Sequence, residues 1–162
     1  MLVAALLGYG ALAIDAAFFP LPIQGSLIAY ERTAPHESPW VVLVPLQSGL
    51  RMLAGTPDTA VEQLGGNIAL FVPFGFMVPL LCRSRPSAAR ILTMAFGASM
   101  AVEAMQLALS ATYGYPYRLA SADDVLLNVL GAAIGYHLYR LTRPVLEPVL
   151  GEPIPDTPEL LD

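Results

Sequence analysis

Four apolar stretches, each close to the length that crosses a lipid bilayer, constrain this chain more than any other feature of its sequence. The hydrocarbon core of a membrane is roughly 30 Å thick, so a spanning helix needs about 17 to 25 mainly apolar residues. Stretches of this kind lie at residues 2–19, 67–82, 91–110 and 124–141. The sequence therefore predicts an all-α membrane protein, a compact bundle of four transmembrane helices.

The charge content of the chain also indicates that lipid surrounds most of it. Only 13% of the 162 residues are charged, whereas soluble domains carry about 25% charged residues. Residues 144–162 differ, because they contain five prolines, five acidic residues and no basic residue. We expect a transmembrane domain at residues 1–143, followed by a disordered, acidic, proline-rich cytoplasmic tail at residues 144–162.

Two of the stretches contain residues that are unusual in a membrane helix. Asp15 lies in the first stretch, and no Arg or Lys precedes it, so a retained helix is favoured over a cleaved signal peptide. Pro73 and Pro79 lie in the second. Neighbouring helices in a bundle can satisfy the backbone groups that a proline leaves free, so we expect this stretch to span the membrane.

Arginine residues near the ends of the stretches predict the orientation of the bundle. They are Arg83, Arg85 and Arg90 between the second and third stretches, and Arg140 and Arg143 at the end of the fourth. Positively charged residues beside transmembrane helices stay on the cytoplasmic side. Both termini are therefore expected to be cytoplasmic, with loops 20–66 and 111–123 facing outward.

The first outer loop, residues 20–66, contains short segments with signals of their own. Residues 40–46 are apolar but too short to span, so we expect an interfacial or re-entrant segment with its tryptophan at the headgroup level. Thr59 and Glu62 have the spacing of a capping box, which predicts the start of a short helix. The glycine pair at residues 65–66 predicts a flexible break before the second transmembrane helix.

The polar residues of the third and fourth stretches fall on one narrow stripe of each predicted helix. At about 100° per residue, these stripes carry Ser99, Glu103, Gln106 and Ser110 on the third helix, and Asp124, Asn128, Gly131 and Gly135 on the fourth. Polar groups in a membrane usually face the interior of the bundle, so we expect the two stripes to face each other. Gly131 and Gly135 would allow close backbone approach, or alternatively would mediate a homodimer.

The outer halves of these stripes predict a polar pocket that opens to the outside of the membrane. Glu103, Gln106, Asp124 and Asn128 should meet there. Arg118 and Asp123 lie in the loop directly above, Asn67 begins the second helix at the same level, and Asp15 is a further candidate. The expected ligand-binding residues are Asn67, Glu103, Gln106, Arg118, Asp123, Asp124 and Asn128. We also expect Arg118 to pair with Glu103 or Asp124.

Other classes of site receive little support from the sequence. The single cysteine, Cys82, excludes an internal disulfide, and His36 and His137 both lie away from the acidic cluster, so we expect no metal site. We find no phosphate-binding glycine loop and no Ser-His-Asp set, and expect no cofactor. The lack of a basic patch argues against nucleic-acid binding. Tyrosines at residues 113, 115 and 117 favour an interfacial aromatic belt over a sugar-stacking site.

The order and spacing of several of these residues resemble the VanZ-like family. The resemblance rests on Asn67-Ile-Ala-Leu-Phe-Val-Pro-Phe-Gly-Phe76, Glu103-Ala-Met-Gln106, Arg118, Asp123-Asp124 and Asn128-Val-Leu-Gly131. It covers about residues 40–141, and the tyrosine-rich loop and acidic tail depart from it. Members of this family are multi-span bacterial membrane proteins, typified by one associated with low-level teicoplanin resistance.

The resemblance implies a protein of the bacterial plasma membrane that is surrounded by membrane lipids and affects teicoplanin susceptibility. It would bind an envelope precursor or a glycopeptide in the outward pocket. The alternative is a membrane-embedded enzyme acting on a lipid-linked envelope substrate, with Glu103 and Asp124 as an acid–base pair. The sequence leaves open whether the protein is catalytic, which ligand it takes, and its oligomeric state.

Overall fold

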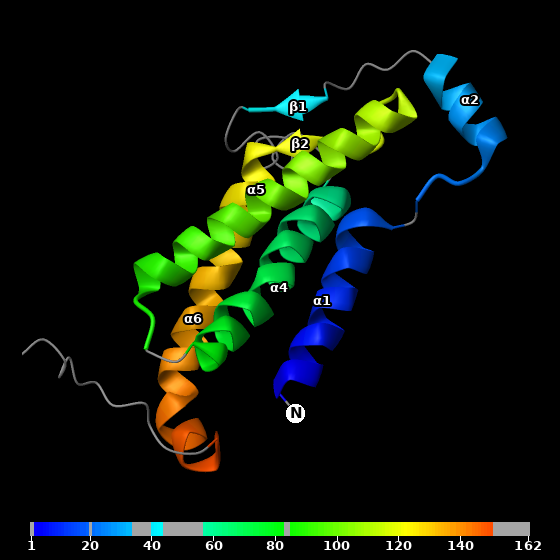
Figure 1. Ribbon diagram of the computed structural model, residues 1–162. Helices are drawn as coiled ribbons and strands as arrows, with labels where there is room; N and C mark the ends of the chain where they lie inside the picture. The colour runs from blue at the N-terminus through cyan, green and yellow to red at the C-terminus, as the bar shows by residue number, and fades with distance from the viewer. Residues whose placement is uncertain (1, 20, 34–39, 44–56, 83–84, 151–162) are drawn as a thin grey trace, which may run out of the picture.

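The computed structural model describes residues 2–19, 21–33, 40–43, 57–82 and 85–150. In these ranges the elements are α1 (Leu2–Phe18), α2 (Gly25–Thr33), β1 (Val41–Val42), α4 (Pro57–Leu81), α5 (Ala88–Tyr113), β2 (Ala120–Ser121) and α6 (Ala122–Leu150). Figure 1 shows α1, α4, α5 and α6 side by side as a bundle, with α2 and the short strands at one end. The prediction of an all-α protein is therefore confirmed, apart from one short strand pair.

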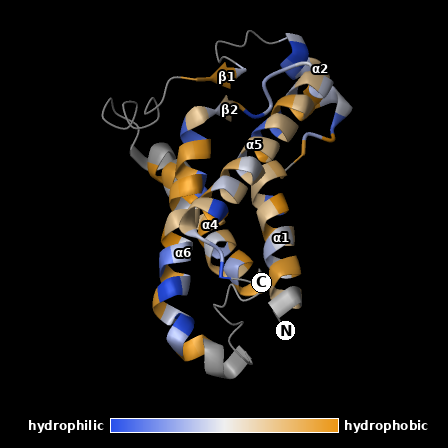
Figure 2. Cartoon of the chain, turned by 60° about the vertical axis from the view of Figure 1, so that its left-hand side comes forward, coloured by the Kyte–Doolittle hydropathy of each residue, from blue (hydrophilic) through white to orange (hydrophobic). Residues whose placement is uncertain are grey.

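Two helices in the described part of the chain are long and apolar enough to cross a membrane. They are Leu64–Leu81, within α4, and α5, Ala88–Tyr113. The apolar part of α1, Ala4–Phe18, is shorter. Figure 2 shows mostly apolar residues along the bundle, with hydrophilic residues around α2 and toward the C-terminal end of α6. The expected spans at 67–82 and 91–110 thus correspond to such helices, whereas spanning by α1 and α6 stays a prediction.

Helix α4 starts earlier than predicted and has no break at the glycine pair. It begins at Pro57, where a proline suits the first helical turn because its missing N–H has no partner there anyway. It then continues through residues 65–66 and includes both Pro73 and Pro79. The expected flexible break is therefore wrong: both glycines stay helical, although each costs roughly 1 kcal/mol relative to alanine.

Close backbone contact between α4 and α6 holds the centre of the bundle. A Cβ atom added at Gly131 would overlap the carbonyl oxygen of Ile68, and one at Gly135 would overlap that of Val72. On the facing helix, a Cβ at Gly75 would overlap the carbonyl oxygen of Ala132. The glycine face of α6 thus meets α4, and the expectation that it meets the third helix, α5, is wrong.

Hydrogen bonds and apolar packing attach the other helices to this pair. Phe71, Ala95 and Ala132 form a small buried core between α4, α5 and α6. The hydroxyl of Tyr9 on α1 donates to the carbonyl oxygen of Leu70 on α4 at 2.7 Å. Gly114, whose φ of 79° suits a glycine, ends α5 and turns the chain toward the site.

Strands β1 and β2 form a parallel pair beside the C-terminal end of α5 (Figure 1). Val41 is in register with Ala120, and Val42 with Ser121. The sequence predicted no strand here, because this pairing joins segments about 80 residues apart. Residues 44–46 of the expected interfacial segment lie outside the described residues.

Helix α6 extends beyond the predicted end of the fourth span. It reaches Leu150, so the prediction of disorder is wrong for residues 144–150. A proline removes one backbone hydrogen bond but does not by itself end a helix, and composition alone therefore misplaced this boundary. The rest of the predicted tail, residues 151–162, lies outside the described residues.

Candidate functional site

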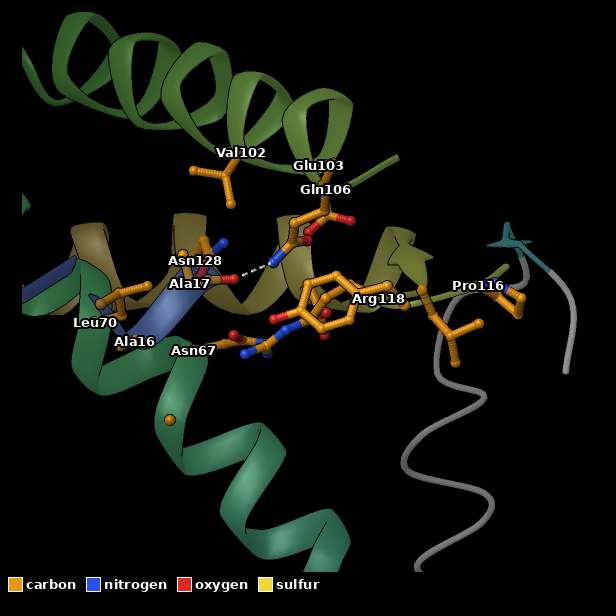
Figure 3. Close-up of a pocket in the computed structure, with 14 residues that line it drawn as sticks. Ala16, Ala17, Asn67, Leu70, Val102, Glu103, Gln106, Pro116, Arg118 and Asn128 are labelled. Atoms are coloured by element: carbon orange, nitrogen blue, oxygen red, sulfur yellow. Dashed lines mark hydrogen bonds between the residues drawn. The ribbon is translucent and has the colours of Figure 1, made fainter. Parts of the chain in front are cut away.

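A polar cavity of about 610 Å³ lies between the C-terminal end of α1, α4, α5, the start of α6 and the loop that leads to α6. Six of the seven predicted ligand-binding residues line it: Asn67, Glu103, Gln106, Arg118, Asp124 and Asn128. They come from three helices and a loop, and Figure 3 shows the five of them that it labels, all but Asp124, with side chains around one space. The helical stripes derived from the sequence therefore meet as expected at the level of the cavity.

Glu103 is buried, with only 6% of its surface exposed. Its Oε2 accepts a hydrogen bond of 2.8 Å from the backbone N–H of Ser121 in β2. The strand pair fixes this N–H, because Ala120 also donates to the carbonyl oxygen of Trp40. The carboxylate is thus held in place by the backbone and is not free to swing through the cavity.

Three side chains of the cavity wall bind the C-terminal end of α1. Gln106 Nε2 donates to the carbonyl oxygen of Ala17 at 2.9 Å (Figure 3). The Tyr117 hydroxyl donates to Phe18 at 2.8 Å, and Arg118 Nη2 donates to Phe19 at 3.0 Å. The last carbonyls of a helix lack partners within the helix, so these contacts satisfy three successive acceptors.

Arg118 has a further role in this arrangement. Its charge complements the negative end of the α1 dipole. The hydroxyl of Ser110, a buried residue of the predicted α5 stripe, donates to the carbonyl oxygen of Arg118 at 3.0 Å and accepts from its N–H at 3.2 Å. The arginine backbone is therefore fixed to α5, and its guanidinium spans from that helix to α1. Pairing of Arg118 with Glu103 or Asp124 stays a prediction.

Two asparagine side chains in the cavity have polar atoms without a partner among the described residues. Asn128, 2% exposed, donates from Nδ2 to the hydroxyl of Ser99 at 2.9 Å, but its buried Oδ1 accepts nothing. The buried Nδ2 of Asn67 likewise donates to nothing. Asn67 lies well inside α4, so it does not cap that helix. A buried unpaired polar atom costs about 1–3 kcal/mol, and a ligand group that pairs with these atoms would recover part of it.

Two acidic residues that the sequence placed near the cluster do not reach the cavity. Asp123 is buried, and its backbone N–H donates to the Ser121 hydroxyl, but it does not line the cavity. Successive helical residues point about 100° apart, so Asp124 faces the cavity and Asp123 faces elsewhere. Asp15 is exposed on α1 and is also not part of the lining.

Sequence reasoning missed the position of Tyr117. It predicted an interfacial tyrosine belt, yet Tyr117 lines the cavity and its ring packs 5.6 Å from that of Tyr113. Burial raises the pKa of the neighbouring Tyr115 above its usual value. The spacing of the tyrosines could not have shown this, because Tyr113 ends α5 and the chain turns at Gly114 before it reaches Tyr117.

The cavity can bind a polar molecule, and its groups favour several hydrogen bonds over a metal ion. In the described ranges no group of three or more His, Cys, Asp or Glu side chains lies together. The lining instead offers a guanidinium, two carboxylates and three amides.

Comparison with known proteins gave one match. A family model described as VanZ/LLP1 matches residues 6–143, a range that contains every lining residue of the cavity. No curated protein and no solved structure matches the chain.

Proposed function

The chain belongs to the VanZ/LLP1 family, and from this premise we propose that it binds a cell-envelope ligand or a glycopeptide in the polar cavity and thereby alters teicoplanin susceptibility. One observation carries the proposal. Six residues chosen from the sequence, spread over more than 60 positions, line a single cavity. The link to teicoplanin comes from the family resemblance, and the place of binding comes from the geometry.

The proposed topology has four spans in a bacterial plasma membrane, with both termini in the cytoplasm. The N-terminus, the α4–α5 link and the C-terminal part of α6 lie at one end of the bundle, and the strands lie at the other (Figure 1). Arg85, Arg90, Arg140 and Arg143 belong to the first of these ends. By the positive-inside rule this end is cytoplasmic, so the cavity opens outward, where a glycopeptide or an envelope precursor is found.

The chemistry of the lining suits such ligands. Glycopeptides and envelope precursors carry many amide and hydroxyl groups, which both donate and accept hydrogen bonds. The unpaired Oδ1 of Asn128 needs a donor and the unpaired Nδ2 of Asn67 needs an acceptor. Among the described residues, the Arg118 guanidinium donates to the carbonyl oxygen of Phe19 alone. It has five N–H donors in all, so it can also bind an acceptor on the ligand.

Susceptibility measurements in a sensitive Gram-positive host test this proposal. Cells carrying the wild type, Glu103→Gln, Asp124→Asn or Asp15→Asn would be exposed to teicoplanin and to vancomycin, with membrane abundance matched by immunoblot. Asp15→Asn is the control, because it removes an acidic group that lies outside the cavity lining.

We expect the wild type and Asp15→Asn to raise teicoplanin tolerance and both cavity variants to lose that effect. If all four proteins behave alike, or if none changes tolerance to either drug, the proposed function is wrong.

A second candidate function is a membrane-embedded enzyme that acts on a lipid-linked substrate. Glu103 and Asp124 line the same cavity, as an acid–base pair must. This version predicts that Glu103→Gln abolishes turnover of the substrate while ligand binding survives. Product formation at the wild-type rate by Glu103→Gln would rule it out.

A further inference from the structure

An apolar groove lies on the other side of Glu103 from the polar cavity. It has a volume of about 470 Å³ and is formed by α5, the start of α6 and the strand pair. Glu103 and Ser121 contribute to it, and its other walls are apolar or small, with Phe96, Met100 and Val125 among them. Glu103 is thus a wall of both spaces, and its hydrogen bond to Ser121 lies at the boundary between them.

The groove follows α5 along the direction that crosses the membrane. Phe96, Met100 and Glu103 follow one another at spacings of four and three residues, which places them on one face of the helix. At 1.5 Å per residue, this run covers about 10 Å. Leu107 continues the lining one turn beyond Glu103, so in the proposed topology the groove runs from the outer part of α5 past Glu103 toward the middle of the bilayer.

The apolar walls of the groove are open to the surroundings of the bundle. Phe96 is 52% exposed, Met100 46% and Leu126 54%. Helix α5 is long and apolar enough to cross a membrane, so these side chains face hydrocarbon chains. Its polar lining residues, Glu103 and Ser121, stand where the groove borders the polar cavity, and apolar residues line the groove on both sides of Glu103. The apolar length suits the hydrocarbon chain of a lipid, and the adjoining cavity suits a polar head.

From this geometry we infer that the ligand of the polar cavity is an amphiphile drawn from the outer leaflet of the membrane. Its hydrocarbon chain lies in the groove along Phe96 and Met100, and its polar head enters the cavity beside Glu103. This inference rests on the proposed function and names its ligand class. The head carries a hydroxyl or an amide, because Asn67 Nδ2 requires an acceptor and Asn128 Oδ1 a donor.

A lipid fits the groove better than a helix from a second copy of the chain. A packed transmembrane helix buries a stripe along most of its length, whereas this groove follows α5 only from Phe96 to Leu107, about three turns. A partner helix would also bring more hydrocarbon against the Glu103 carboxylate, which is costly inside a membrane. An amphiphile places its own polar end there instead.

Native mass spectrometry of the full chain in a mild detergent tests the inference. The key variant is Ala104→Phe, which adds a large side chain to a wall of the groove at an exposed position. The matched control is Ala101→Phe, an exposed position on the same helix that does not line the groove. We expect the wild type and the control to retain one lipid per chain after surrounding lipid has been stripped, and Ala104→Phe to retain it about tenfold less, a change of about 1.4 kcal/mol.

Quenching of tryptophan fluorescence by a brominated phospholipid locates the hydrocarbon chain of the bound lipid. Trp40 is the single tryptophan of the sequence and precedes Val41, which lines the groove. In vesicles of phosphatidylglycerol with brominated chains, whose head group carries hydroxyls, its fluorescence should be quenched in the wild type and in Ala101→Phe, and less so in Ala104→Phe. Equal quenching in all three proteins, or no retained lipid in the wild type, would overturn the inference. A dimer that Ala104→Phe dissociates would also overturn it, in favour of a second copy.

Teicoplanin tolerance separates this inference from the proposed function. If the amphiphile is the ligand, Ala104→Phe loses tolerance together with the retained lipid, and Ala101→Phe keeps both. Loss of the lipid with full tolerance would refute the amphiphile as ligand while the proposed function stands. If Glu103→Gln and Asp124→Asn leave tolerance unchanged, the proposed function fails, whatever the lipid measurement gives.

Discussion

Substitution of Gly135 by alanine tests the contact that holds the bundle together. The added Cβ would overlap the carbonyl oxygen of Val72 and lie against the backbone N of Phe76. All of these neighbours are main-chain atoms of α4, so no side chain can rotate away to make room. The two helices must move apart, and this movement would disturb the side chains of Asn67 and Asn128, which extend the same interface into the cavity.

The size of the effect follows from two opposing terms. Overpacking a tight interface costs typically about 1–3 kcal/mol, while alanine gains up to about 1 kcal/mol over glycine in a helix. Gly97→Ala provides the matched control, because Gly97 lies on α5 with nothing within 4 Å of an added Cβ. The control has the same propensity gain without the overlap, so the difference between the two variants isolates a steric cost of about 1–3 kcal/mol.

Unfolding of the purified protein in mixed micelles, followed by circular dichroism as the denaturing detergent increases, measures this difference. We expect Gly135→Ala to unfold at a clearly lower detergent fraction than the wild type, and Gly97→Ala at the same or a higher one. Equal midpoints for Gly135→Ala and Gly97→Ala would refute the close α4–α6 contact. The homodimer alternative predicts another result, in which Gly135→Ala abolishes crosslinking between chains in native membranes and leaves the monomer as stable as before.

Two further predictions follow from the site, and a third follows from the proposed topology. Asn128→Leu replaces a buried amide that has only one of its two polar atoms paired by an apolar group of similar size. The free energy of unfolding should therefore change by less than about 1 kcal/mol, while teicoplanin tolerance is lost. A large loss of stability would show that the amide is structural. Tyr117→Phe removes the hydrogen bond to Phe18 and should cost about 0.5–1.5 kcal/mol in the same unfolding assay, whereas Tyr30→Phe, on an exposed side chain, should cost nothing. Cys82, at the predicted cytoplasmic end of α4, should react with a membrane-impermeant maleimide only after cells are permeabilised; labelling of intact cells would invert the proposed topology.

Helical periodicity predicted most of the residues that line the cavity, for a simple physical reason. A polar side chain in an apolar helix turns away from lipid, and the 100° step then fixes which residues share its face. Glu103, Gln106 and Asn128 were found in this way. Asp123 was not separated from Asp124, since both precede the apolar run and only the exact start of α6 determines which of them faces the cavity.

Contacts between distant segments could not be predicted in the same way. Periodicity identifies the glycine face of α6 but not the helix that covers it, and the structure places α4 there instead of α5. The pairing of Val41 with Ala120 joins two-residue strands that have no pattern of their own. The length of α4 and α6 was also underestimated, because glycines and prolines were interpreted as helix ends, whereas both helices continue through such residues.

The contacts of α1 affect how variants of the cavity should be interpreted. Gln106, Tyr117 and Arg118 line the cavity and also hold the last carbonyls of α1. A loss of function in any of these three variants is therefore explained equally well by a displaced helix and by a lost ligand contact. Glu103 and Asn128 make no such contact to α1 among the bonds described above, so their isosteric variants discriminate between the two explanations. If Glu103→Gln and Asn128→Asp keep full tolerance while Arg118→Gln loses it, the cavity wall serves to position α1, and the surface that acts on the ligand lies elsewhere on the outer face.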